Sequence, residues 1–259
     1  MVFGRKPFDL SNLHVPRQPG TYPERVGTKL ERMVSKDHHK SLNARTLAAA
    51  CRTLAAADPI FGTVHTIYGT PPLWDRPAGF ATVLQIILEQ QVSLASAKAC
   101  FDKLAVHLGE VTPDGVLSLD DARLKSIGFS RQKTVYARHL SEAVLERRID
   151  LDSLQHLPDA EVKAELVGLK GIGEWTSDIY LLMALLRPDV MPKGDIALHA
   201  AYQKLTGSDA RPRSDEFLAI AERWKPFRSA AARMLWHFYL SERRDRKISA
   251  KTKSGKARK

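Results

Sequence analysis

The chain has 259 residues, of which 44% are hydrophobic and 27% charged, and this composition is ordinary for a globular protein of one or two domains with a sizeable core. Its two cysteines, Cys51 and Cys100, are too few for a disulfide framework, a four-cysteine zinc site or a four-thiolate iron–sulfur cluster. No apolar run approaches the roughly 20 residues that span a bilayer, and the N-terminus lacks an apolar signal core. We therefore expect a cytoplasmic protein.

The net charge of +11 is concentrated at the two ends of the chain. Residues 1–45 hold 9 Lys/Arg against 4 Asp/Glu and residues 242–259 hold 9 against 2, whereas residues 46–241 hold 22 against 23. We predict a basic, proline-containing arm at 1–45 with a short helix near 26–36, a folded core at 46–241, and a basic, disordered tail at 242–259. Such a tail can raise affinity for nucleic acid by releasing counterions or can simply keep a protein soluble, and charge alone leaves both interpretations open.

Apolar residues recur at helical spacing throughout the core, and no series of alternating strands with tight turns appears. The alanine-rich segment 42–57 predicts a helix, and the long apolar stretch 79–108 predicts two helices with a break near 90–93. Further helices are expected at 130–147, 159–167, 174–186, 195–205, 214–223 and 227–242. The sequence therefore predicts an all-α fold.

One segment, Leu169-Lys170-Gly171-Ile172-Gly173, lies between two predicted helices. Its glycines allow a tight turn whose backbone N–H groups point outward, and at a helix N-terminus such donors favour an anion, typically a phosphate. Ile172 is expected to anchor the turn by packing inward. Two spaced glycines alone are weak evidence, because most such turns are structural. The full pattern L-x-G-L-x-G-I-G-x-W-T over 166–176, with a helix on each side, strengthens the phosphate interpretation.

Residues 166–176 resemble the helix-hairpin-helix of the base-excision DNA glycosylase superfamily. Asp195, in the segment Pro192-Lys193-Gly194-Asp195, matches the position of that superfamily's catalytic aspartate. Residues 88–93, 124–133 and 223–229, with Trp236 after them, resemble segments of its 3-methyladenine DNA glycosylase II branch, which acts on alkylpurines. The resemblance covers about 79–241 and implies a fold of two helical subdomains that flank a cleft.

The resemblance implies a monofunctional glycosylase that flips an alkylated purine out of double-stranded DNA and hydrolyses its N-glycosidic bond in base excision repair. This hydrolysis develops positive charge on the sugar, which a nearby carboxylate stabilises while it orients or deprotonates a water. Asp195 is the candidate carboxylate. It could also be merely the N-cap of the helix expected at 195–205, and the two roles are compatible.

Aromatic faces suit an alkylated purine, because alkylation leaves the base cationic and electron-poor. The resemblance suggests a base pocket that contains Trp175, Phe227, Trp236 and Tyr180, with Trp224 as a further candidate. Trp175 and Phe227 match pocket positions more closely, whereas the other three are more simply explained as core packing. Trp175 also stands where bifunctional relatives carry the lysine that forms a Schiff base with the sugar, which predicts that strand-cleaving lyase activity is absent.

The same resemblance implies that DNA phosphate is bound by the hairpin residues Gly168, Leu169, Gly171, Ile172, Gly173 and Thr176. Gln91, at the break between the two early helices, is the candidate wedge that fills the gap left by the flipped nucleotide, although a capping glutamine fits the sequence nearly as well. The nine histidines show no paired spacing for a metal, and His199 is expected to be buried. No cofactor is expected, although the family's hairpin can hold a monovalent cation through backbone carbonyls.

Two other interpretations compete with an alkylpurine glycosylase. A non-enzymatic DNA-binding protein with the hairpin as a phosphate clamp would explain the glycines and the basic ends, but not Asp195 and Trp175. A glycosylase of the same fold could act on another lesion, and the missing hairpin lysine argues against the usual oxidised-purine type. The expected partner is double-stranded DNA with damaged bases, bound by a monomer away from any membrane, at the nucleoid if the protein is bacterial. Pocket shape decides between 3-methyladenine, 7-methylguanine, ethenoadenine and hypoxanthine.

Overall fold

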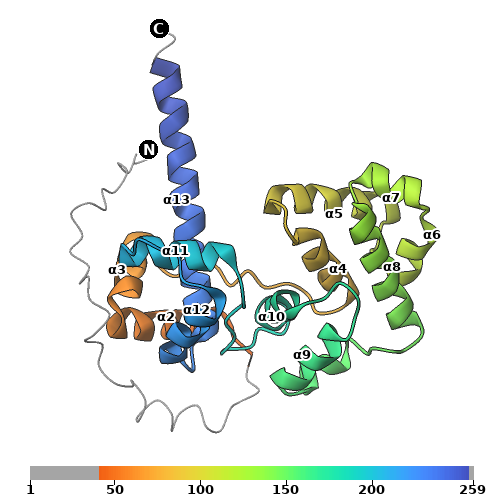
Figure 1. Ribbon diagram of the computed structural model, residues 1–259, viewed down its shortest axis with the longest axis horizontal. Helices are drawn as coiled ribbons and strands as arrows, with labels where there is room; N and C mark the ends of the chain where they lie inside the picture. The colour runs from red at the N-terminus through yellow and green to blue at the C-terminus, as the bar shows by residue number, and fades with distance from the viewer. Residues whose placement is uncertain (1–40, 257–259) are drawn as a thin grey trace. The chain divides into compact units, whose positions relative to one another are not determined.

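The computed structural model describes residues 41–256, with side chains described from 41 to 245. Within these residues the chain forms twelve α-helices, two short 3-10 helices and no strand (Figure 1), so the predicted all-α class is confirmed. Residues 1–40 of the arm predicted at 1–45, with the short helix expected near 26–36, lie outside the described residues, and its last two residues begin α2 (Ala44–Ala57).

The described chain divides into two compact helical units, in agreement with the two expected subdomains. One unit, called here the terminal unit, combines Asn43–Leu73 with residues 194–256. The other, called the central unit, contains Trp74–Lys193 together with residues 41–42. The chain passes from the central to the terminal unit immediately before Asp195.

The terminal unit is built around its last helix. It contains α2 (Ala44–Ala57), α3 (Pro59–Tyr68), α11 (Ile196–Thr206), α12 (Ser214–Ala221) and α13 (Arg228–Lys256). The first turns of α13 pack against α2, α3 and α11 (Figure 1). Ala230, Ala231 and Ala232 are all buried there, and side chains this small let three neighbouring helices approach the same segment.

An aromatic cluster with a buried carboxylate lies inside the terminal unit. Trp224 stacks edge-on against Phe61 and Phe217, with ring centroids 5.1 and 6.0 Å apart. Asp58 caps α3 and accepts a hydrogen bond from Trp224 Nε1 at 3.0 Å. The same carboxylate forms an ion pair with Arg223 at 3.1 Å. Trp224 is therefore a core residue, and it does not contribute to a base pocket.

The central unit is arranged around α4. Its helices are α4 (Phe80–Glu89), α5 (Leu94–Leu108), α6 (Pro113–Ser118), α7 (Asp121–Ile127), α8 (Arg131–Leu145), α9 (Asp159–Val167) and α10 (Glu174–Met183). α4 packs against α5, α8 and α10, and its residues 82–84 and 86–88 are buried. A helix that is apolar on nearly every side must be surrounded in this way, because no face of it can be left in water.

The structure differs from the sequence prediction at short helices and at the C-terminus. Helices α3, α6 and α7 were not expected, although Asp58, Thr112 and Asp120 cap them with side-chain hydrogen bonds and Pro begins the first two. The predicted disordered tail is wrong as far as Lys256, because α13 continues to that residue. No proline and, before position 255, no glycine interrupts this helix.

Candidate active site

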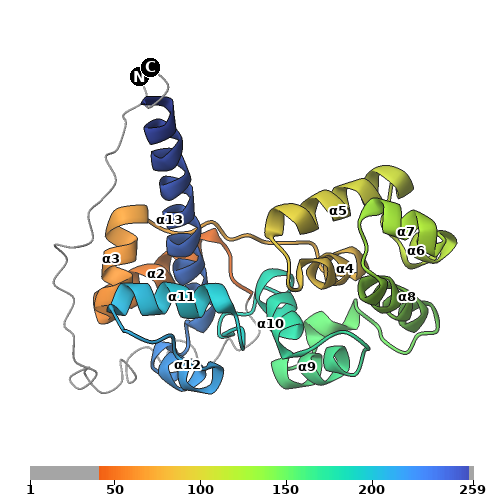
Figure 2. The ribbon, with the colours of Figure 1, turned by 45° about the horizontal axis from the view of Figure 1, so that its top comes forward.

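The predicted hairpin is present in the central unit: α9 and α10 pack against each other (Figure 2) and are joined by a turn at 168–173. Gly171 has φ 90°, and a Cβ placed on it would lie 2.2 Å from the ring of Tyr136 on α8. Glycine is therefore required both by the backbone conformation and by the close approach of the ring. Ile172 is buried, so the prediction that it packs inward is confirmed.

The backbone N–H groups of the hairpin are not equally available for a phosphate. Those of Gly168, Leu169 and Ile172 donate to carbonyls of the hairpin itself, each at 3.1 Å. Gly173 is the N-cap residue of α10, is exposed, and a Cβ placed there would meet no atom within 4 Å. An anion at this hairpin is therefore best placed at Gly173, where the helix begins, and the three bonded N–H groups are poorer candidates than the sequence suggested.

Gln90, which the sequence analysis did not single out, joins α4 to the hairpin. It is the C-cap residue of α4, and its Nε2 donates to Gly171 O at 2.8 Å and to Thr176 Oγ1 at 2.9 Å. Thr176 is only 3% exposed, so its hydroxyl supports the hairpin from inside. This contact involves only the side chain, so phosphate binding by Thr176 stays a prediction for its backbone N–H.

Gln91 lies at the exposed turn between α4 and α5. Its φ of 58° is left-handed, which aims the side chain differently from those of the helical residues around it. The capping positions belong to its neighbours, since Gln90 ends α4 and Ser93 begins α5 by accepting a bond from Ser96 N at 3.2 Å. A left-handed residue directly after the C-cap is a common way to end a helix, so both the capping alternative and the wedge role of Gln91 stay predictions.

The segment 124–133 supports the last turn of α4. It forms the end of α7, a turn, and the start of α8, where Ser130 caps the helix by accepting a bond from Lys133 N at 3.2 Å. Lys133 Nζ donates to Leu88 O at 2.5 Å, and burial lowers the pKa of this lysine. A cation at the C-terminal end of α4 stabilises its unpaired carbonyls just before Gln90 and Gln91.

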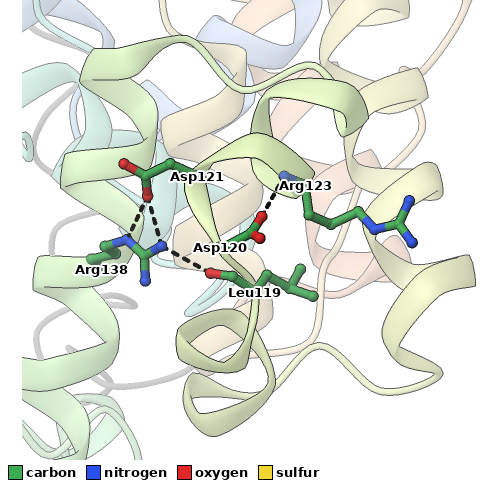
Figure 3. Close-up of polar contacts among 5 residues, drawn as sticks. All are labelled: Leu119, Asp120, Asp121, Arg123 and Arg138. Atoms are coloured by element: carbon green, nitrogen blue, oxygen red, sulfur yellow. Dashed lines mark hydrogen bonds and ion pairs between the residues drawn. The ribbon is translucent and has the colours of Figure 1, made fainter.

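A polar cluster holds α7 against α8 (Figure 3). Arg138 Nη2, from α8, donates to Asp121 Oδ1 at 2.7 Å and to Leu119 O at 2.8 Å, while Asp120 caps α7 by accepting a bond from Arg123 N at 2.7 Å. These contacts are confined to the two helices and the turn before them. They fix α7 against α8, the helix that also carries Lys133.

The chain just before Asp195 is tied to the hairpin helices. Lys193 N donates to Asp178 Oδ2 at 3.0 Å, and Lys193 Nζ pairs with Glu174 Oε2 at 2.8 Å. Asp178 is 2% exposed, and burial raises its pKa although Lys163 of α9, at 2.8 Å, opposes this shift. Asp178 was missed by the sequence analysis. The signal was an acidic residue placed directly before the apolar run 179–183 that ends α10.

Asp195 belongs to the terminal unit, where it is the N-cap of α11. Its Oδ1 accepts hydrogen bonds from Ala197 N and Leu198 N, both at 3.0 Å, and from Trp236 Nε1 at 3.2 Å. The capping interpretation is therefore confirmed, and it leaves catalysis open. Asp195 is 8% exposed, so it is a nearly buried, rigidly oriented carboxylate, and such enclosed groups act strongly on charge that develops beside them.

The aromatic candidates separate into two groups. Tyr180 is 1% exposed and its hydroxyl accepts a bond from Gly79 N at 3.0 Å, so it is a core residue of the central unit and not part of a base pocket. Trp236 is 8% exposed and holds Asp195 through its indole N–H, a role different from the predicted stacking face. Trp175, in the first turn of α10, and Phe227, just before α13, are half-buried residues.

His199 is buried beside Asp195 on α11, as expected. Its ring packs on Phe217 with centroids 4.6 Å apart, and its Nε2 is buried without a hydrogen-bond partner. Burial lowers the pKa of His199, with the negative charge of Asp195 opposing and Arg211 adding to the shift.

Other kinds of site have little support among the described residues. Within them, no three His, Cys, Asp or Glu side chains gather as ligands for a metal ion, and no helix has the length and apolar character to cross a membrane. The hairpin carbonyls of Leu169, Gly171 and Gly173 each accept a hydrogen bond, from Ile172 N, Gln90 Nε2 and Ser177 N respectively. A carbonyl has a second lone pair, so a monovalent cation at the hairpin stays a prediction from the resemblance.

Residues 84–226 match the HhH-GPD superfamily of base excision DNA repair proteins. The chain belongs to this superfamily. The HhH-GPD match begins within α4 and therefore includes the Gln90–Gln91 turn, the whole hairpin and Asp195.

Several similar proteins are named 3-methyladenine DNA glycosylases. A putative DNA-3-methyladenine glycosylase of Bacillus subtilis is 29% identical over 176 residues, which are 65% of this chain and 61% of that protein. DNA-3-methyladenine glycosylase 1 of Schizosaccharomyces pombe is 29% identical over 62% of this chain and 73% of its own length. The solved structure of the S. pombe 3-methyladenine DNA glycosylase with abasic DNA is 25% identical, with a TM-score of 0.67 over 73% of this chain and 95% of that one.

Proposed function

We propose that this HhH-GPD protein is a monofunctional DNA glycosylase that excises alkylated purines, of the 3-methyladenine type, from double-stranded DNA and acts as a monomer. The observation that carries the proposal is the environment of Asp195, whose carboxylate is oriented by two N-terminal amides of α11 and by Trp236. Two residues earlier, Lys193 is bound to the hairpin helix through Asp178 and Glu174. The names of the similar proteins support the same class of substrate.

The proposed reaction begins with a nucleotide flipped out of the duplex while backbone N–H groups at the start of α10 bind a neighbouring phosphate. The C1′–N bond breaks and its electron pair returns to the alkylated base, which departs neutral because alkylation had made it cationic. The carboxylate of Asp195 stabilises the positive charge that develops on the sugar. Water then bonds to C1′ and gives up a proton, for which Asp195 is the acceptor, and an abasic site remains.

The base pocket is proposed to use Trp175 and Phe227, which are both half-buried residues. A cationic purine is attracted to an aromatic face by cation–π interaction, so a pocket of this kind selects alkylated over normal purines. Trp175 also replaces the lysine of bifunctional relatives, so no Schiff base can form at this position. The abasic product should therefore stay uncleaved, and borohydride should trap no protein–DNA adduct.

A release assay on a panel of lesions tests the proposal. Duplexes that carry 3-methyladenine, 7-methylguanine, ethenoadenine or hypoxanthine are incubated with the parent protein and with Asp195→Asn, and free base is measured. We expect release of at least one alkylated purine by the parent and loss of release in Asp195→Asn, with an intact abasic strand. Binding of damaged duplex without release of any of the four bases would favour a non-enzymatic DNA-binding protein. Release of hypoxanthine alone would assign a different lesion.

A further inference from the structure

Gln90 stands between the two parts of the molecule that would engage DNA. On one side it ends α4 and is followed directly by Gln91, the exposed left-handed residue of the α4–α5 turn. On the other side its amide reaches the hairpin at Gly171 O and Thr176 Oγ1, at 2.8 and 2.9 Å. All of these residues belong to the central unit, so the contact is internal to one compact body.

The orientation of the Gln90 amide follows from its partners. A backbone carbonyl can only accept, so the group that faces Gly171 O must be the donor Nε2. The amide nitrogen carries two hydrogens, and the carbonyl of Gly171 and the hydroxyl oxygen of Thr176 take one each. No other side chain of the same length offers two neutral donors on one atom, and glutamate would place an oxygen against the carbonyl.

Both ends of this link are held by other contacts. Arg76 forms a two-pronged pair with Glu89, the residue before Gln90, at 2.9 and 3.1 Å. Gly171 is covered by the Tyr136 ring, whose hydroxyl accepts a hydrogen bond from Gln132 at 2.5 Å. A rigid turn therefore meets a rigid hairpin, and the amide of Gln90, which belongs to the turn, is hydrogen-bonded to the hairpin.

We infer that Gln90 is a positioning residue that fixes the distance between the Gln91 wedge and the phosphate-binding start of α10. The inference rests on the proposed function, because it assumes that both elements bind the same damaged duplex. A wedge can fill the gap left by a flipped nucleotide only if it stands at one distance from the phosphate beside that nucleotide. Gln90 would make wedge insertion and phosphate binding a single event.

The test uses a duplex with a stable abasic-site analogue next to 2-aminopurine, whose fluorescence rises when wedge insertion unstacks it. Gln90→Met keeps the length and packing of the side chain but removes both donors. We expect it to lower the preference for this duplex over undamaged duplex about tenfold and to reduce the fluorescence change to that of Gln91→Ala. In a Gln91→Ala background, Gln90→Met should cost less than twofold more, because coupled residues are not additive.

Two results would overturn the inference. One is a preference and fluorescence change of Gln90→Met within twofold of the parent. The other is an effect that adds fully to that of Gln91→Ala, as a merely structural role predicts. If Gln90→Met does not fold, Thr176→Val is compared with Thr176→Ser, because only serine keeps the hydroxyl that accepts from Gln90. An equal preference of these two variants for the abasic duplex over undamaged duplex would refute the coupling. Neither assay needs bond cleavage, so a parent that inserts its wedge but releases no base contradicts only the proposed function.

Discussion

Single polar residues, buried or half-buried, organise the candidate site, and each has a specific task. Gln90 donates to the hairpin, Asp178 accepts the backbone N–H of Lys193, and Asp195 accepts from α11 and Trp236. Buried polar groups are tolerated only when they are hydrogen-bonded, so these three side chains fix the local backbone as firmly as apolar packing does. His199 is the exception, because its Nε2 has no partner.

His199 predicts a pH dependence of stability. Burial lowers its pKa in the folded protein, so the unfolded chain takes up a proton first as the pH falls. The stability that depends on neutral His199 is present above about pH 6.5 and is lost as the pH falls through the lowered folded pKa. We expect the unfolding free energy of the parent to fall relative to that of His199→Gln between about pH 7.5 and 5, measured by urea unfolding. A difference that does not change with pH would contradict this account.

At the scale of elements, the hairpin depends on two glycines that have different reasons to be there. Gly171 is required by the fold, through its positive φ and the Tyr136 ring. Gly173 has ordinary φ of −106° and open space around it, so the fold does not require glycine at that position. Close approach of an external phosphate would explain it.

The pair Gly171→Ala and Gly173→Ala separates these two roles. Gly171→Ala should lower the unfolding free energy by about 2 kcal/mol or more, because the new Cβ meets the ring and the backbone is strained. Gly173→Ala should change it by less than about 1 kcal/mol while it weakens DNA binding several-fold. Chemical denaturation and fluorescence anisotropy measure the two quantities. Equal destabilisation by both substitutions, or unchanged DNA affinity in Gly173→Ala, would show that the hairpin was misassigned.

The sequence was informative where a pattern was long or specific, and silent where contacts are distant along the chain. Apolar periodicity located the long helices, and the glycine pattern located the hairpin to within one residue of each helix end. Gln90 and Asp178 were missed, because their partners lie 81 and 15 residues away and depend on how helices pack. The resemblance suggested Tyr180 and Trp236 for a pocket, and their burial supports the simpler interpretation as packed residues that the sequence also favoured.

At the scale of the whole molecule, the excess positive charge and the residues of the candidate site are separated along the chain. The core at 46–241 is nearly neutral, with 22 Lys/Arg against 23 Asp/Glu, and the excess lies in the terminal segments. The basic C-terminal segment is helical to Lys256, as the continuation of α13 (Figure 1). A basic helix can bind the phosphate backbone without any sequence preference.

Removal of residues 246–259, which carry seven Lys/Arg and no Asp/Glu, tests this role. We expect weaker binding to undamaged duplex, by at least about tenfold at low salt, and a shallower dependence of affinity on salt. A matched variant of full length, with the same seven residues changed to Gln, should behave in the same way if charge is the cause. Base release at saturating enzyme should be little changed. Loss of base release would show that residues 246–259 are needed for catalysis and not only for affinity.

The measurement that tests the central claim most directly is the single-turnover rate of 3-methyladenine release by Asp195→Asn at saturating enzyme. Asparagine keeps an oxygen that can accept from Ala197, Leu198 and Trp236, so the cap and the fold are preserved while the charge is lost. We predict a rate at least about 100-fold below that of the parent, with affinity for abasic-site duplex within about threefold. Release at the rate of the parent would contradict the account.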